Sequence, residues 1–107
     1  LFDVGDCEGT KISYTKAIMR FQEIIEKFEG ITPVNAQYRI GNLYEELALL
    51  FENEQRVYYN RAKDAYTHII DEKKSIELFG SIRELTCIRT EQAKDRVKCI
   101  EKELRYK

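Results

Sequence analysis

The 107-residue sequence has few of the residues from which metal and cofactor sites are usually built. It contains one histidine, one proline, one methionine and no tryptophan, and its three cysteines show no Cys-x-x-Cys spacing. A single histidine and isolated thiols do not indicate a zinc site, and an odd number of cysteines does not indicate a disulfide framework. The sequence therefore predicts no bound metal, no cofactor and no disulfide-stabilised scaffold.

Long apolar runs and an excess of one charge are also absent. The longest apolar run, Leu47 to Phe51, is far shorter than the roughly 20 residues of a membrane span. Eighteen Lys and Arg residues against nineteen Asp and Glu residues leave a formal net charge of −1, which provides no overall field that favours nucleic acid or an anionic membrane. We expect a soluble protein that does not span a bilayer and does not bind nucleic acid.

The cysteines and the start of the chain bear on its compartment. Three unpaired thiols favour a reducing compartment, so we expect the cytoplasm, with a domain of an exported or envelope-associated protein as the alternative. Cys87 and Cys99 lie about 18 Å apart on one predicted helix, too far for a disulfide, and we expect both to be buried. The chain begins at Leu1 without a signal-peptide pattern, which predicts a part of a longer protein.

One stretch of the sequence occurs twice. The segment from Tyr14 to Ile25 reads YTKAIMRFQEII, and the segment from Tyr59 to Ile70 reads YNRAKDAYTHII. The tyrosine, the alanine and the final pair of isoleucines recur at a separation of about 45 residues, and a repeat of this length is typical of stacked helical hairpins.

Apolar residues at steps of three and four predict four helices. We expect them over residues 13–28, 33–52, about 54–72 and from 75 to beyond 104, preceded by an irregular lead-in over residues 1–10. Residues 11–107 then form one domain. Gly30 is expected to end the first helix, Thr32 to cap the second before Pro33, and Ser75 to cap the last.

The second and last predicted helices have further expected properties. The second is apolar over so much of its surface that it requires neighbours on two sides, and Gly41 within it predicts a partner helix close to its backbone. The apolar stripe of the last helix passes through either Ile88 or Arg89. Its end is expected to project beyond the bundle and to allow assembly with another helix.

The repeat resembles the tetratricopeptide repeat, in the variant of bacterial envelope-assembly and division-coordination proteins. The resemblance covers about residues 13–90 and rests on these positions: Ala17, Phe21, Thr32, Pro33, Ala36, Tyr38, Ile40, Gly41, Tyr44, Ala62, Tyr66, Ile82, Leu85 and Ile88. It implies antiparallel helical hairpins in which the first helix of each unit lines a concave groove. The fold class expected is therefore all-α, of tetratricopeptide-like type, with about four helices and a long last one.

The resemblance also implies candidate residues for partner binding. They lie on the two helices expected to line the groove: Asn35, Tyr38, Arg39, Asn42, Glu45, Phe79, Ile82, Arg83 and Thr86. Arg39 and Arg83 could bind a carboxylate or an acidic peptide, because a guanidinium donates bidentate hydrogen bonds to a carboxylate. The alternative is that both are surface arginines paired with Glu45 or Glu84.

The only histidine, His68, shares a helical face with Asp64 and Glu72 at steps of four residues. This spacing could hold a metal ion weakly, but without a second histidine or a nearby thiolate we predict a solvent-facing side chain.

The sequence thus predicts a non-catalytic interaction module, an adaptor or scaffold that binds a peptide or helix of a partner protein. One alternative is a structural segment of a larger helical-repeat assembly or subunit interface. The other is a regulatory module of an enzyme, which a pocket with carboxylates converging on His68 would indicate.

Overall fold

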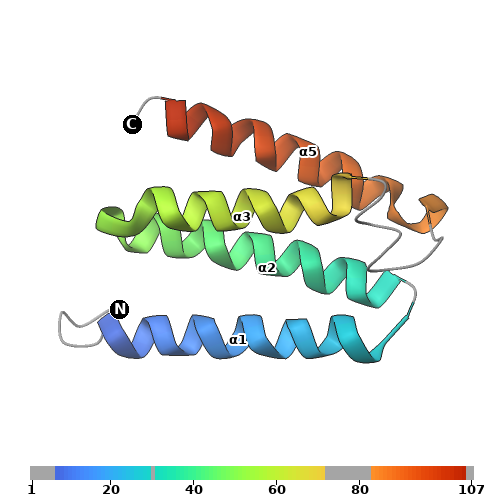
Figure 1. The fold of residues 1–107 in the computed structure, drawn as a ribbon, viewed down its shortest axis with the longest axis horizontal. Helices are drawn as coiled ribbons and strands as arrows, with labels where there is room; N and C mark the ends of the chain where they lie inside the picture. The colour runs from blue at the N-terminus through green and yellow to red at the C-terminus, as the bar shows by residue number, and fades with distance from the viewer. Residues whose placement is uncertain (1–6, 30, 72–82, 106–107) are drawn as a thin grey trace.

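The computed structural model of the chain describes residues 7–29, 31–71 and 83–105, and within these ranges the fold is all-α (Figure 1). In chain order the elements are α1 (Cys7–Lys27), α2 (Ile31–Leu50), the short 3-10 helix η2 (Glu52–Glu54), α3 (Gln55–Ile70) and α5 (Arg83–Arg105). The described ranges contain no strand, and none of their helices is long and apolar enough to cross a bilayer. The predicted all-α class with a long last helix is confirmed.

The four α-helices lie side by side in chain order, and each runs antiparallel to the one before it (Figure 1). α1 packs on α2, α2 packs on α3, and α5 lies mainly on α3 with a smaller contact to α2. The overall dimensions are 45 × 32 × 19 Å. The shortest dimension is about two helix diameters, so the described helices stack about two layers deep.

A first apolar cluster joins α1 to α2. Ile18 of α1 packs in it with Ile40, Leu43 and Leu47 of α2, and Ala65 of α3 belongs to the same cluster. The apolar stripe of α1 is therefore covered by the helix that follows it, as the sequence predicts.

A second apolar cluster joins α2, α3 and α5. Its buried members come from all three helices: Val34, Ala48, Tyr59, Ala62, Tyr66, Ile69, Ala93 and Ile100. Because α2 contributes to both clusters, the prediction that it has neighbours on two sides is confirmed.

The two copies of the sequence repeat lie in α1 and α3 and differ in burial. Tyr59, Ala62 and Tyr66 of the α3 copy are buried, whereas the equivalent residues of α1 are only partly buried. The reason is that α3 lies between α2 and α5, while the contacts of α1 are chiefly with α2. The copy in α1 therefore keeps a side that the described part of the chain leaves uncovered.

Gly41 marks a close approach of α2 to α3. A Cβ atom at this position would lie 2.6 Å from Cζ and 2.8 Å from Cδ1 of Tyr66, closer than real Cβ atoms come to other atoms. Tyr66 is fully buried, so its ring has no free space into which to move. The prediction that a partner helix passes close to Gly41 is confirmed.

α5 packs on the bundle through Arg89 and not through Ile88. Ile88 is 69% exposed, and the packed stripe continues from Arg89 through Ala93, Val97, Ile100 and Leu104. Since Leu104 packs against the second cluster, the described end of α5 lies on the bundle and does not project from it. Cys99, predicted to be buried, is exposed because it stands beside this stripe.

The structure corrects two predicted helix boundaries. α1 begins at Cys7, so the lead-in predicted over residues 1–10 is helical from residue 7, and Thr10 in this added turn is buried. α2 begins at Ile31, which places Thr32 and Pro33 inside its first turn. Proline is tolerated there because the N–H groups of a first turn have no acceptor within the helix. The predicted boundary residues Gly30 and Ser75 lie outside the described residues.

Candidate functional site

The face of α2 that the sequence selects for partner binding is covered by α5 of the same chain. Arg89 of α5 donates a hydrogen bond from Nε to Asn35 Oδ1 at 2.6 Å, and its guanidinium carbon lies 4.9 Å from the centre of the Tyr38 ring. Two turns further along α5, Arg96 Nε donates to Glu45 Oε2 at 3.0 Å. One face of α5 thus meets one face of α2 through two arginines.

The other sequence-predicted site residues have different positions. Asn42 donates from Nδ2 to the carbonyl oxygen of Tyr38 at 2.6 Å, within α2 itself. Arg39 is exposed, and Glu45, its suggested partner, pairs with Arg96. Arg83 and Thr86 lie at the start of α5, where the structure describes only the helix, and Phe79 and Ile82 lie outside the described residues.

A buried hydrogen-bond network lies at the contact between α2, α3 and α5. The Tyr66 hydroxyl donates to Glu45 Oε2 at 2.5 Å, and Arg96 donates to both carboxylate oxygens of Glu45. Burial, and then the hydrogen bond to Glu45, raise the pKa of the Tyr66 hydroxyl above its ordinary value. The native state therefore holds the proton of Tyr66 more tightly than the unfolded state does.

This network predicts a loss of stability at alkaline pH. The folded-state pKa of Tyr66 is raised, so its contribution is fully present below the unfolded pKa of about 10 and is lost as the pH rises above that value. We expect the free energy of unfolding, measured by urea denaturation, to fall progressively as the pH rises above about 10. The fall should be smaller in Tyr66→Phe, and an equal fall in both proteins would contradict the assignment to Tyr66.

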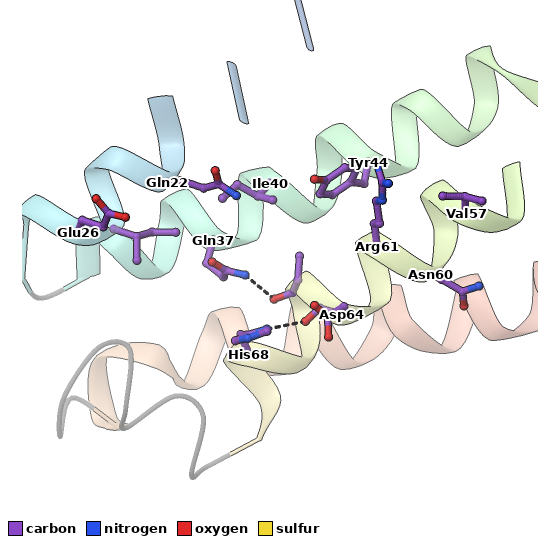
Figure 2. A pocket seen from close by; sticks show the side chains of 12 residues that line it. Gln22, Glu26, Gln37, Ile40, Tyr44, Val57, Asn60, Arg61, Asp64 and His68 are labelled. Carbon is purple, nitrogen blue, oxygen red and sulfur yellow. Dashed lines mark hydrogen bonds between the residues drawn. The ribbon is translucent and has the colours of Figure 1, made fainter. Parts of the chain in front are cut away.

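An open groove lies on nearly the opposite side of α2, between α1 and α3 (Figure 2). Its volume is about 860 Å³, and it is lined by side chains from all three helices: Gln22, Ile25, Glu26, Gln37, Ile40, Tyr44, Val57, Asn60, Arg61, Asp64, Ala65 and His68. Figure 2 shows the α1 side chains Gln22 and Glu26 on one side, the α3 side chains on the other, and Gln37, Ile40 and Tyr44 between them. α1 and α3 are therefore its walls and α2 its floor.

A smaller hollow of about 170 Å³ continues this groove towards the start of α1. It shares Gln22, Tyr44 and Arg61 with the larger part and adds Thr15, Ile18, Met19, Leu47 and Tyr58. From Thr15 to Glu26 the α1 wall is about 16 Å long, at 1.5 Å per residue. We call the two parts together the α1–α3 groove; it is long enough for three turns of a helix.

Polar side chains in the α1–α3 groove are held by bonds to the α3 backbone. Gln37 is only 8% exposed and donates from Nε2 to the carbonyl oxygen of Ala65 at 3.0 Å (Figure 2). His68 Nδ1 lies 2.8 Å from the carbonyl oxygen of Asp64, and because a carbonyl only accepts, Nδ1 is the donor. These bonds fix the orientation of both side chains relative to the groove.

Arg61, in the middle of the α3 wall, is held by aromatic rings. Its guanidinium carbon lies 6.0 Å from the ring centre of Tyr44 and 5.8 Å from that of Tyr58. These are distances at which a cation is attracted to the face of an aromatic ring. The described lining of the groove thus carries one guanidinium, Arg61, and two carboxylates, Glu26 and Asp64.

The surroundings of His68 do not form a metal centre within the described residues. No group of three or more His, Cys, Asp or Glu side chains that could hold an ion comes together there, and Glu72 lies outside those residues. His68 lines a groove, but its hydrogen bond is to a backbone carbonyl, and Glu26 stands on the opposite wall (Figure 2). The carboxylates do not converge on the imidazole.

Sequence reasoning missed the α1–α3 groove. Its walls are the two copies of the repeat, so the repeat itself was the available signal, but the apolar periodicity marks only the positions that pack. The polar groove residues recur at steps of four, Gln22 and Glu26 on α1 and Asn60, Asp64 and His68 on α3, but polar residues at helical spacing are also the ordinary pattern of a solvated face and do not indicate a groove. Comparison of the chain with protein-family models, with curated proteins and with solved structures gave no match, so the resemblance to tetratricopeptide repeats remains a prediction.

Proposed function

We propose that this chain is a non-catalytic interaction module, of tetratricopeptide-like type, that binds a peptide or helix of a partner protein in the α1–α3 groove. The observation that supports it most is the groove itself: about 860 Å³, open, walled by two helices and floored by a third. Clefts of this size with a mostly apolar lining and a few placed polar groups are the usual form of binding sites.

The groove offers apolar contact area that the described chain leaves exposed. Met19 on the α1 wall is 55% exposed and Val57 on the α3 wall is 49% exposed. Ile40 and Ala65 lie between them and are buried. A ligand side chain placed in the groove would remove both exposed side chains from water, at about 25 cal/mol for each Å² of apolar surface.

The contact between α2 and α5 shows the kind of recognition that these helices support. α5 lies on α2 and α3 through an apolar stripe, flanked by arginines that bond Asn35 and Glu45. Helix-in-groove recognition of a partner uses the same elements, apolar anchors at helical spacing with polar groups beside them. In this proposal α5 fills one face of the array, and the α1–α3 groove on the other face is the site for the partner.

Photo-crosslinking tests the proposal. A photoreactive phenylalanine analogue at Met19 or at Val57 is expected to capture peptides selected for binding from a random library. The same analogue at Leu49 or Ile88, which are 66% and 69% exposed but do not line the groove, is expected to capture none. Capture chiefly from the two control positions would contradict the proposal.

Polar substitutions at the exposed apolar residues of the groove test the proposal through their effect on peptide affinity, in comparison with the same substitutions outside the groove. Met19→Gln combined with Val57→Gln places two neutral polar side chains on the apolar rims, and we expect the peptide affinity, measured by fluorescence anisotropy, to fall about tenfold. Leu49→Gln combined with Ile88→Gln is the control and should leave the affinity unchanged. If the unmodified chain instead self-associates in sedimentation and the first variant is monomeric, the groove serves assembly and the alternative of a structural segment is favoured.

A further inference from the structure

We infer that the partner segment is an amphipathic helix carrying a basic side chain, arginine above all, which lies between Glu26 of α1 and Asp64 of α3. The inference rests on the proposed function and adds the chemistry of the ligand. Three observations support it: the charges of the two walls, the hydrogen-bonding state of the floor, and the way in which α5 already contacts this chain.

The two walls of the groove carry carboxylates that have no ion-pair partner among the described residues. Glu26 and Asp64 both line the groove, both are exposed, and neither forms an ion pair with another described residue. Arg61, the cation of this lining, is engaged with the rings of Tyr44 and Tyr58. With two carboxylates against one guanidinium, the described lining keeps a net negative charge that favours a cationic ligand.

The floor of the groove adds acceptors to these carboxylates. Gln37 is more than nine-tenths buried and uses Nε2 for its bond to Ala65, which leaves Oε1 as an acceptor without a partner among the described residues. In the neutral ring of His68, Nδ1 donates to the Asp64 carbonyl, so Nε2 is an acceptor too. A site rich in acceptors requires donors from its ligand, and a guanidinium supplies five N–H groups.

The shape of the groove favours a helix as the carrier of that side chain. Both walls are helices, and the described residues offer no strand edge to which an extended peptide could add. The groove is about 16 Å long, which equals about three helical turns or 11 residues. A helix of this length presents apolar anchors at the first, fourth or fifth, and eighth positions, with room for one basic residue beside them.

The chain itself already shows an arginine-bearing helix against acceptor side chains. On the opposite face of α2, Arg89 of α5 bonds the amide oxygen of Asn35, and Arg96 bonds the carboxylate of Glu45. Beside these arginines, Ala93 and Ile100 pack into the second apolar cluster. The α1–α3 groove presents the same two acceptor types, an amide oxygen and carboxylates, next to apolar residues.

Selection from a peptide library that varies the charge at one position tests the inference. The probe is a display library of amphipathic helices of about 15 residues, long enough for three to four turns, with one position beside the apolar face restricted to Arg, Lys, Gln or Glu. We expect Arg, and then Lys, to be enriched after selection on the whole chain. Replacing that residue by Glu in a selected peptide should weaken its affinity about tenfold or more.

Neutral substitutions of similar shape at the two carboxylates show whether their charge, and not their shape, determines the affinity for the peptide. Glu26→Gln combined with Asp64→Asn should weaken binding of the Arg peptide about tenfold and leave the Gln version of the peptide nearly unaffected. The control is Glu23→Gln combined with Asp95→Asn, which changes the net charge equally at exposed carboxylates outside the groove lining. It should change neither affinity.

The outcomes separate this inference from the proposed function. If selected peptides crosslink from Met19 or Val57 but show no preference among the four residues, or prefer Glu, the inference is wrong and the proposed function stands. Peptides that bind outside the groove, or a library that yields no binder, would overturn both.

Discussion

Replacing Arg96 by methionine is expected to lower the free energy of unfolding by about 2 kcal/mol, less than the loss of about 3–5 kcal/mol found for fully buried ion pairs, because Arg96 is itself partly exposed. Arg96 is 43% exposed in its side chain and Glu45 only 12%, so the residue left behind is the buried one. Its carboxylate would keep the hydroxyl of Tyr66 as its hydrogen-bond donor and would have no counter-charge. The expected loss of stability therefore comes from leaving the Glu45 carboxylate without an ion-pair partner.

The same reasoning predicts that removing the whole network costs less than removing its cation. A triple variant with Glu45→Leu, Tyr66→Phe and Arg96→Met leaves no buried charge and no unpaired hydroxyl. Apolar replacements of a buried ion pair are often neutral or stabilising. We expect the triple variant to be more stable than Arg96→Met alone, although it contains two further substitutions.

Guanidinium denaturation followed by circular dichroism measures both effects. Arg39→Met is the matched control, because Arg39 is an exposed arginine on α2, and it should change the stability by no more than about 0.5 kcal/mol. If Arg96→Met costs no more than Arg39→Met, the pair contributes nothing to the fold. If the triple variant is the least stable of all, the hydrogen bonds of the network themselves stabilise the fold. The unpaired charge of Glu45 is then not the main cause of the loss in Arg96→Met.

The features of the fold that depend on local apolar periodicity could be predicted from the sequence. Ile18 and Phe21 of α1, and Ala62 and Tyr66 of α3, stand at helical spacing on stripes that the structure covers with α2. The breadth of the apolar surface of α2 predicted its two neighbours, since a helix cannot leave so much apolar surface in water. These features depend on residues within one helix, so a pattern along the chain records them.

Contacts between distant parts of the chain could not be predicted in this way. Arg96 lies 51 residues from Glu45 and Arg89 lies 54 residues from Asn35. Nothing in the order of the sequence states which of its charged side chains will meet. The sequence did select Asn35, Tyr38 and Glu45 as a polar face able to recognise another chain segment. That α5 of the same chain would cover this face depends on how the helices stack.

Gly41→Ala is the second substitution with a large expected effect on stability. We expect it to destabilise the fold, although alanine has a higher helix propensity than glycine. In an isolated helix, Gly41→Ala would stabilise α2 by about 1 kcal/mol, because alanine loses less backbone entropy than glycine. In this fold the new Cβ would lie 2.6 Å from Cζ of Tyr66, and forcing an extra methyl group into a packed core costs about 1–3 kcal/mol. Because the Tyr66 ring is fully buried and bonded to Glu45, we expect the clash to prevail, with a net loss of up to about 2 kcal/mol.

A double-mutant cycle with Tyr66→Ala shows whether the ring is the cause. Tyr66→Ala alone should cost about 3–5 kcal/mol through the cavity that it leaves. In that background Gly41→Ala meets no ring, so it should become neutral or stabilising by up to about 1 kcal/mol, as propensity requires. Denaturant unfolding of the four proteins gives the coupling between the two positions. A Gly41→Ala substitution that destabilises the chain equally in both backgrounds would show that the backbone of α2, and not the Tyr66 ring, requires the glycine.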